Sequence, residues 1–350
     1  MKTIHVEASK KYDVMISNGL IDNVGEICKE KIGVSRGVVI TDSNVDKLYS
    51  KRLIASLSDA GYMVTKFVFE AGEQSKNSDI LVKILEFLAS SSITRSDCIF
   101  ALGGGVVGDI SGFAAAIYLR GIRFVQIPTT LLAAVDSSVG GKTGIDLKSG
   151  KNLAGAFHQP SLVICDPLLL DTLKPEIFAD GMAEVIKYGV INDRVLFDTL
   201  KNGVKENIEE IIASCVNNKS KIVKADEFDT GMRQLLNLGH TIGHSIEKLS
   251  NFSISHGSAV AIGMVIVTRA AIAHGLCDAT ALAELTDLLK KTKLPTECPF
   301  SAAEIAEVAL SDKKRQHDTI NLVVPYAIGD TRLLPVSVDQ LEAFVLKGLK

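Results

Sequence analysis

Residues 98–109 read CIFALGGGVVGD, an apolar strand that runs into three consecutive glycines and then into a helix. The helical pattern continues to residue 119 with mostly small side chains. Glycines at such a junction let the backbone approach a pyrophosphate, and the helix N-terminus favours the phosphate charge. The spacing is not GxGxxG, so the standard dinucleotide fingerprint is absent. A phosphate cradle and a plain tight turn both remain open.

Short apolar runs and helical patterns alternate on both sides of this segment, which is typical of a mostly parallel sheet. In such sheets ligands bind beyond the carboxyl ends of the strands. Asp42, glycines 103–105 and residues 128–130 each follow a predicted strand, so we expect them at that edge. The predicted strands are 37–42, 64–69, 98–102, 124–127 and 162–165, and the predicted helices are 46–61, 78–90 and 110–119.

From Pro175 onward the pattern becomes mainly helical. We therefore predict an α/β domain over 1–178 and an all-α domain over 179–350. A cleft between two such domains is a common place for a small-molecule site. The predicted helices here are 177–200, 204–224, 232–250, 256–275, 279–291, 302–311 and 338–348, with a short strand-like piece at 320–324.

The composition excludes several classes of protein. The 350 residues carry 38 Lys and Arg against 41 Asp and Glu, without the basic excess of a nucleic-acid binder. No run of 18 apolar residues is present and the N-terminus lacks the apolar block of a signal peptide, so neither a transmembrane helix nor secretion is expected. Six cysteines without a CxxC pair predict free thiols in a reducing compartment, which favours the cytoplasm.

Residues 136–152 are predicted to form a polar, glycine-containing loop. The run GGKT at 140–143 looks like the end of a Walker A motif, but Asp136 stands where that motif needs a glycine. A P-loop NTPase is therefore not expected. Lysines 142, 148 and 151 suit a phosphate ligand, and a solvated loop without a ligand is the alternative.

The segment 233–244 has polar side chains at helical spacing. Arg233, Asn237, His240 and His244 are separated by four, three and four residues. If the segment is one helix, the four side chains share one stripe. We interpret this stripe as functional, with a purely structural role for the histidines as the alternative.

Glu184, Lys187 and His256 add candidate groups for a metal site. Two histidines and one carboxylate are the ligand set of a catalytic zinc site with an open position. The HExxH motif of metalloproteases is absent. A surface ion pair between Glu184 and Lys187, three residues apart on a predicted helix, remains the alternative.

Together these segments resemble the 3-dehydroquinate synthases, NAD-dependent members of the sugar-phosphate cyclase superfamily, over nearly the whole chain. The most specific part includes GGGVVGD at 103–109, QIPTTLLA at 126–133 and VDSSVGGKTG at 135–144. The segments LNLGHTIGH at 236–244 and His256-Gly257 follow in the family's order. The resemblance implies a dehydroquinate synthase-like fold, with a Rossmann-like NAD-binding domain and a helical domain for metal and substrate.

The resemblance also implies a role for each matching position and a homodimer in which Arg120 reaches the neighbouring site, with no nucleic-acid or membrane partner. It implies one divalent metal, zinc or cobalt, held by Glu184, His240 and His256. It implies NAD contacts at Asp42, Asn44, Glu73, Lys76, Gly105, Val106, Asp109, Thr129, Thr130, Lys142, Lys151 and Thr172. It implies substrate contacts at Arg120, Asp136, Lys142, Asn152, Lys187, Lys219, Arg233, Asn237, His244 and Lys314. Of these, the implied catalytic residues are His244, Lys142, Lys187, Asp136, Asn152 and Arg233.

The implied activity is a carbon–oxygen lyase reaction that converts 3-deoxy-D-arabino-heptulosonate 7-phosphate to 3-dehydroquinate and phosphate. This is the second step of chorismate and aromatic amino acid biosynthesis. It passes through transient oxidation by NAD, phosphate elimination, reduction, ring opening and aldol closure. Arg233 and Lys219 are expected at the substrate carboxylate, and Lys142, Asn152 and Arg120 at the phosphate. His244 is expected to relay a proton.

Two positions depart from the family pattern. Ser258 replaces the glutamate that follows His-Gly, and Asp229 replaces a glutamate four residues before Arg233. We expect activity to be retained, with metal affinity the more sensitive property because the support of His256 differs.

Three other functions remain as alternatives. Related cyclases act on substrates without a carboxylate, but they tend to lose the Arg/Asn/His set that is present here. Metal-dependent polyol dehydrogenases share the implied fold and release NADH, and the lysines of 142–151 argue against them. A non-enzymatic binding module leaves the ligand set and the lysine loop without a purpose.

Overall fold

The chain divides into two compact units. The computed structural model describes residues 1–311 and 318–350. The first unit contains Met1–Leu173 and Ile212–Phe228, and the second contains Lys174–Ile211 and Asp229–Lys350. The second unit thus begins close to the change of pattern at Pro175, while residues 212–228 belong with the first unit.

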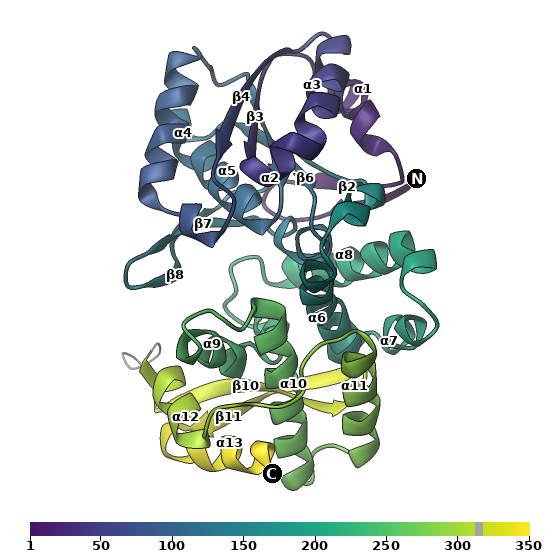
Figure 1. Cartoon of the computed structure of the whole chain (residues 1–350), viewed down its shortest axis with the longest axis vertical. Coiled ribbons are helices and arrows are strands. Elements are labelled where there is room, and N and C mark those ends of the chain that lie inside the picture. The colour runs from purple at the N-terminus through teal and green to yellow at the C-terminus, as the bar shows by residue number, and fades with distance from the viewer. Residues whose placement is uncertain (312–317) are drawn as a thin grey trace. The chain divides into compact units, whose positions relative to one another are not determined.

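The first unit is built on a seven-stranded sheet with the order β1-β2-β9-β6-β5-β3-β4. Its strands β3 and β4 lie side by side (Figure 1). Every neighbouring pair is parallel except β1 and β2. The predicted parallel sheet is confirmed, and all five predicted strands are present. The strands are β1 (Lys2–Val6), β2 (Tyr12–Ile16), β3 (Arg36–Asp42), β4 (Met63–Phe69), β5 (Cys98–Gly103), β6 (Arg123–Pro128) and β9 (Leu162–Cys165).

Helices cover both faces of this sheet, which explains why its inner strands β5 and β9 are apolar and buried throughout. Val39 and Phe100 pack in one core with residues of α1 and α3. Their neighbours Ile40 and Ile99 pack in a second core with residues of α4 and α5. The helices are α1 (Val24–Ile32), α2 (Ser43–Val45), α3 (Lys51–Asp59), α4 (Ser78–Ser90), α5 (Gly105–Ile117) and most of α8 (Ile208–Ala225), with the 3-10 helices η1 (Leu20–Asn23), η3 (Glu73–Ser75), η4 (Tyr118–Arg120) and η6 (Pro167–Thr172) and the π-helices η2 (Asp46–Ser50) and η5 (Ala133–Ser137).

The polar loop predicted for 136–152 is partly wrong, because most of it forms a hairpin. Strands β7 (Lys142–Leu147) and β8 (Gly150–Phe157) pair antiparallel. Ile145 is buried in the same core as α5. A side chain at Gly112 of α5 would meet Thr143 Cγ2 at 2.4 Å, so the hairpin packs tightly on this helix. Lysines and glycines around these few buried residues hide the strand pattern in the sequence.

The second unit is helical and contains one two-stranded sheet. The strand-like piece predicted at 320–324 is part of β10 (Thr319–Ala327), which pairs antiparallel with β11 (Asp330–Ser337). The domain is therefore not all-α as predicted. Its helices are α6 (Pro175–Asn192), α7 (Arg194–Lys201), α9 (His240–Leu249), α10 (His256–Ala273), α11 (Ala279–Lys291), α12 (Ala302–Ser311) and α13 (Leu341–Leu349), with the short helices η7 (Lys205–Asn207), η8 (Met232–Asn237) and η9 (Val338–Gln340).

Two helices predicted as continuous are broken. The helix predicted at 177–200 is interrupted at Asp193, whose side chain accepts a hydrogen bond from the backbone N–H of Leu196 at 2.8 Å and begins α7. The helix predicted at 232–250 is interrupted at Gly239, which has a left-handed backbone with φ of 78°. Only its second part is α-helical, because η8 is a 3-10 helix.

Among the residues that the structure describes, one helix, α10, is long and apolar enough to be compared with a membrane span. Of this segment, 72% is buried inside the structure. A core helix of a folded domain has the same length and composition, so the feature is weak evidence for a membrane span.

Candidate active site

Three helices of the second unit bring a carboxylate and two imidazoles together. Glu184 lies in α6, and His240 and His256 are the first residues of α9 and α10. Glu184 Oε1 lies 3.4 Å from His240 Nε2 and 3.3 Å from His256 Nε2. One ligand atom from each residue lies within 4.8 Å of the others. The geometry fits a single small cation bound by all three.

The backbone around the helix starts explains this convergence. A side chain at Gly257 would meet the carbonyl oxygen of Asp180 at 2.1 Å, so glycine allows α10 to begin against α6. Asp180 Oδ1 also accepts hydrogen bonds from Ser255 Oγ at 2.5 Å and from the backbone N–H of Ser258 at 3.2 Å. These contacts hold the start of α10, and with it His256, against Asp180, which lies one turn before Glu184 on α6.

Both histidines present the same nitrogen to Glu184. The Nδ1 atom of His240 lies 3.1 Å from the carbonyl oxygen of Leu238, and that of His256 lies 3.1 Å from Glu247 Oε2. A carbonyl and a carboxylate only accept, so each Nδ1 donates a hydrogen, and Nε2 is the nitrogen that can bind a metal in place of a proton. Histidines that bind metals are held in this way.

The charges of the site also suit a cation. Burial by itself raises the pKa of Glu184, but Lys187 and then His240 outweigh it and hold the pKa well below its usual range. Burial lowers the pKa of His256, but Glu184 and Glu247 outweigh it and raise the pKa to about 10. The Lys187–Glu184 pair is buried, so the surface ion pair considered from the sequence is wrong. The negative charge of Glu184 and Glu247 favours positive charge at His256.

The donor set fits zinc or cobalt with an open position. One carboxylate oxygen and two imidazole nitrogens are ligands that both metals accept. Side-chain exposure rises from 2% at Glu184 to 13% at His240 and 31% at His256. The carboxylate is therefore buried, and the two imidazoles are partly exposed.

The single stripe predicted for Arg233, Asn237, His240 and His244 is wrong. In a 3-10 helix residues four apart point about 120° from each other, because each turn takes about three residues. Arg233 is accordingly buried and Asn237 is exposed on η8. His240 and His244 do share a face of α9, with ring centroids 5.4 Å apart, and the ring of His244 lies 5.9 Å from that of His256. His244 thus lies beside the two candidate histidine ligands.

Glu247 is a residue of this site that the sequence analysis missed. It is buried on α9, and its carboxylate lies within 4.8 Å of the ligand atoms of His244 and His256. The sequence could have indicated it, because Glu247 follows His244 by three residues and His240 by seven. Both spacings place it on the helix face of the two histidines.

In the first unit, the carboxyl ends of three neighbouring strands form one edge, as predicted. Thr41 of β3 is opposite Leu102 of β5, and Gly103 is opposite Pro128 of β6. The backbone N–H of Thr129 donates to the carbonyl of Gly103 at 3.0 Å. Asp42, the glycine triplet and Thr129–Thr130 therefore lie along the same edge.

The glycine triplet has both a packing role and an accessible helix start. A side chain at Gly103 would meet Val107 Cγ2 at 2.4 Å, and one at Gly104 would meet Thr130 Cγ2 at 2.9 Å. Close packing in a tight turn is thus enough to explain why residues 103 and 104 are glycine. The N-terminus of α5, which begins at Gly105, receives no side-chain cap. Its backbone N–H groups can bind an anion.

A charged cluster joins three elements next to this helix start. Lys76 Nζ lies 2.6 Å from Asp109 Oδ2 of α5, 2.5 Å from Asn152 Oδ1 of β8 and 4.0 Å from Glu73 Oε1. The side chain of Lys76 is only 5% exposed. Burial lowers the pKa of Lys76, but Asp109 and then Glu73 outweigh it and raise the pKa. A second pair in this unit joins Lys219 to the carboxylate and carbonyl of Asp136.

The remaining predicted residues have local contacts or lie at the surface. Asp42 Oδ1 accepts hydrogen bonds from the backbone N–H groups of Asn44 and Val45 and caps α2. Thr172 Oγ1 lies 2.6 Å from the hydroxyl of Tyr49, and Thr130 Oγ1 accepts from the backbone N–H of Ala133. Lys314 lies outside the described residues. The other residues are Val106, which is half-buried on α5, Lys151, which is half-buried on β8, and Arg120 and Lys142, which are exposed.

Comparison with known proteins gives matches over most of the chain. The model described as 3-dehydroquinate synthase N-terminal matches residues 66–180, and that described as 3-dehydroquinate synthase C-terminal matches 181–315. A 3-dehydroquinate synthase of Clostridium acetobutylicum is 45% identical over 338 residues, which cover 94% of this chain and 95% of that protein.

Two solved structures share the fold. A 2-deoxy-scyllo-inosose synthase, in complex with carbaglucose-6-phosphate, NAD+ and Co2+, is 25% identical with a TM-score of 0.89 over 99% of this chain and 100% of that chain. A 2-epi-5-epi-valiolone synthase of Streptomyces hygroscopicus, with NAD+ and Zn2+ bound, is 26% identical with a TM-score of 0.88 over 99% of this chain and 98% of that chain. The chain is thus similar in sequence to one group of cyclases and in structure to two others.

Proposed function

This chain belongs to the 3-dehydroquinate synthase family, and on that premise we propose how its residues perform the reaction. The activity is that of a phosphate-eliminating lyase, which converts 3-deoxy-D-arabino-heptulosonate 7-phosphate to 3-dehydroquinate and phosphate. The observation on which the proposal chiefly depends is the set of Glu184, His240 and His256 at one point of the second unit.

The proposed metal is zinc or cobalt, one ion in each chain, held by these three residues. Support comes from the orientation of both Nε2 atoms toward Glu184 and from the Co2+ and Zn2+ named for two related structures. When bound, such a metal polarises a substrate hydroxyl and makes it easier to oxidise. Lys187, buried beside Glu184, limits the excess negative charge of the site.

The proposed place for NAD is the carboxyl edge of the parallel sheet in the first unit. The uncapped start of α5 at Gly105 and Val106 suits the pyrophosphate. Lys76, paired with Asp109 of α5, places a buried cation close to this edge. When bound, NAD supplies a hydride acceptor that is regenerated in each turnover.

Substrate binding is proposed for charged groups in both units. The substrate carries a carboxylate and a phosphate, and charge-assisted hydrogen bonds to such groups are strongest from desolvated cations. In the second unit Lys187 and Arg233 are buried cations, and His244 lies beside the ligands, where it can hold a proton. In the first unit, Lys219 is oriented by Asp136, and Lys142 and Asn152 lie on the β7–β8 hairpin.

A homodimer is also proposed, with Arg120 reaching the site of the neighbouring chain. Leu119, Arg120 and Gly121 have consecutive positive φ angles of 50°, 66° and 119°. Such backbone is costly for non-glycine residues and is found at functional sites. Ile117 and Leu119 beside it are 42% and 41% exposed, as expected for side chains that a second copy covers. A cytoplasmic location is supported by the six cysteines, all of which are free.

Substrate selectivity tests this function. We expect phosphate release from the heptulosonate phosphate and none from glucose 6-phosphate, which lacks the carboxylate that Arg233 is proposed to bind. Phosphate release from glucose 6-phosphate, with none from the heptulosonate phosphate, would instead assign the chain to the inosose-forming cyclases. Both substrates are supplied with NAD and zinc to the same preparation.

A further inference from the structure

We propose that Glu247 is a positioning residue that holds His256 ready to bind the metal, an inference that rests on the proposed metal centre. Its side chain is 5% exposed, and its Oε2 lies 3.1 Å from His256 Nδ1. The opposite nitrogen of the same ring faces Glu184 Oε1 at 3.3 Å. His256 is therefore fixed between two carboxylates, one on each side of the ring.

This contact determines which nitrogen of His256 is available. A carboxylate at Nδ1 accepts a hydrogen bond from the ring N–H, so Nε2 is the nitrogen that can offer its lone pair to a metal in place of a proton. It also increases the electron density of the ring, which strengthens a metal–nitrogen bond. Without Glu247 the ring loses this acceptor and its orientation is less restricted.

The two histidines differ in how they are supported. His240 Nδ1 is held by the backbone carbonyl of Leu238, which no substitution removes. His256 Nδ1 is held by a side chain from a different helix. The affinity of the site for metal is thus adjustable by mutation at Glu247.

Ser258, where the resemblance places a glutamate, has another role. Its hydroxyl lies 2.9 Å from Ser255 Oγ, and its backbone N–H donates to Asp180 at 3.2 Å. These contacts hold the start of α10. The carboxylate at His256 comes from Glu247 on α9, so the absence of a glutamate at 258 does not leave the ring unsupported.

The test measures zinc affinity in the full-length protein by competition with a chromophoric chelator. We expect Glu247→Ala to weaken zinc binding by about 10- to 100-fold, the usual effect of removing such a partner, and Glu247→Gln to weaken it by about 10-fold because the amide accepts the hydrogen without the charge. Glu284→Gln, the same substitution on α11, is the matched control and should leave the affinity unchanged.

The melting temperature of each metal-free variant separates this role from a purely structural one. A structural role lowers the melting temperature and leaves the zinc dissociation constant within twofold of wild type, which would overturn the proposal. If Glu247→Ala does not fold, the affinity of Glu247→Gln decides by the same criterion. If the wild-type protein binds no zinc, both the proposed metal centre and the role of Glu247 are contradicted. If the wild-type protein binds zinc tightly and the Glu247 variants bind it equally well, only the role proposed for Glu247 is contradicted.

Discussion

At the scale of single residues, Arg233 shows how burial and recognition are connected. The residue is 2% exposed and lies on the 3-10 helix η8 rather than on the helix of the two histidines. A buried cation forms strong pairs with anions, because no water competes for the hydrogen bonds of either partner. The role proposed for Arg233 at the substrate carboxylate therefore agrees with its burial, although the helical stripe that first suggested it is wrong.

We expect Arg233→Ala to lower kcat/KM for the heptulosonate phosphate by about 10- to 100-fold, from the loss of a charge-assisted hydrogen bond of about 1.5–3 kcal/mol. Binding of NAD and zinc should not change. Arg233→Lys should recover only part of the activity, because an ammonium lacks the planar fork. A lower melting temperature with normal turnover per folded molecule would show that Arg233 is structural.

At the scale of elements, the break between η8 and α9 sets the position of His240. Gly239 has φ of 78°, and a side chain there would meet the carbonyl oxygen of Val260 at 2.6 Å and the backbone nitrogen of Met264 at 2.9 Å. Both atoms belong to α10, so the glycine lets α9 start directly against the helix that begins with His256. The backbone conformation and the close approach both require glycine.

Gly239→Ala should lower the melting temperature more than Gly275→Ala and should weaken zinc binding. Gly275 is the matched control, because its φ is 69° and a side chain there meets nothing within 4 Å. Gly275→Ala should therefore lose only the folding free energy that a left-handed backbone costs an alanine, about 1–2 kcal/mol. Equal losses of stability in the two variants would contradict the packing argument.

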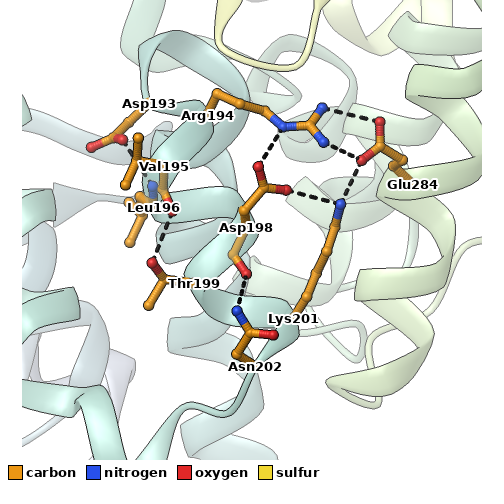
Figure 2. A network of polar contacts seen from close by, with 9 residues as sticks. All are labelled: Asp193, Arg194, Val195, Leu196, Asp198, Thr199, Lys201, Asn202 and Glu284. Carbon is orange, nitrogen blue, oxygen red and sulfur yellow. Dashed lines mark hydrogen bonds and ion pairs between the residues drawn. The ribbon is translucent and has the colours of Figure 1, made fainter.

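A charged network joins α7 to α11 (Figure 2). Glu284 binds the guanidinium of Arg194 at 2.7 and 3.0 Å, and Lys201 contacts both Glu284 and Asp198. Hydrogen bonds from Arg194 and Lys201 hold the pKa of Glu284 below its usual range. Since its side chain is 29% exposed, solvent screens these interactions.

Glu284→Gln should lower the melting temperature at pH 7 by about 1–3 °C, from about 0.5–1 kcal/mol of lost interaction. A carboxylate whose pKa is lowered by folding stabilises the protein at pH values above the pKa of an unfolded glutamate, about 4.3. This stabilisation is lost as the pH falls through the pKa of the folded protein. The difference between the two proteins should thus disappear toward pH 3 and shrink in high salt. A difference that persists at pH 3 would mean that charge is not the cause.

These elements also show how far the sequence predicts the structure. Apolar runs predicted the parallel strands and the polar edge, because strands covered on both faces need continuous apolar side chains. The break at Gly239 was missed, because the spacing of Arg233, Asn237 and His240 also fits one helix. The β7–β8 hairpin was missed because only a few of its residues are buried. The metal ligands came from the resemblance, and spacing alone left them open.

At the scale of the whole molecule, the proposed exchange of Arg120 between chains makes activity depend on the dimer. Arg120→Ala and Lys142→Ala should each be inactive, since both are proposed to bind the phosphate. Mixed after subunit exchange, they should regain up to about one quarter of the wild-type activity, because half of the chains are in heterodimers and each of these has one intact site. Absence of recovery in mixtures that contain heterodimers would contradict a shared site.

The central claim is that the chain is a metal-dependent cyclase that oxidises its substrate only transiently. Phosphate and NADH are measured together during turnover of the heptulosonate phosphate, with and without NAD, and before and after removal of metal with a chelator. We expect one phosphate for each substrate consumed and no net NADH, loss of activity without metal, and recovery with zinc or cobalt. Accumulation of NADH with turnover, or full activity in a verified metal-free preparation, would contradict the claim.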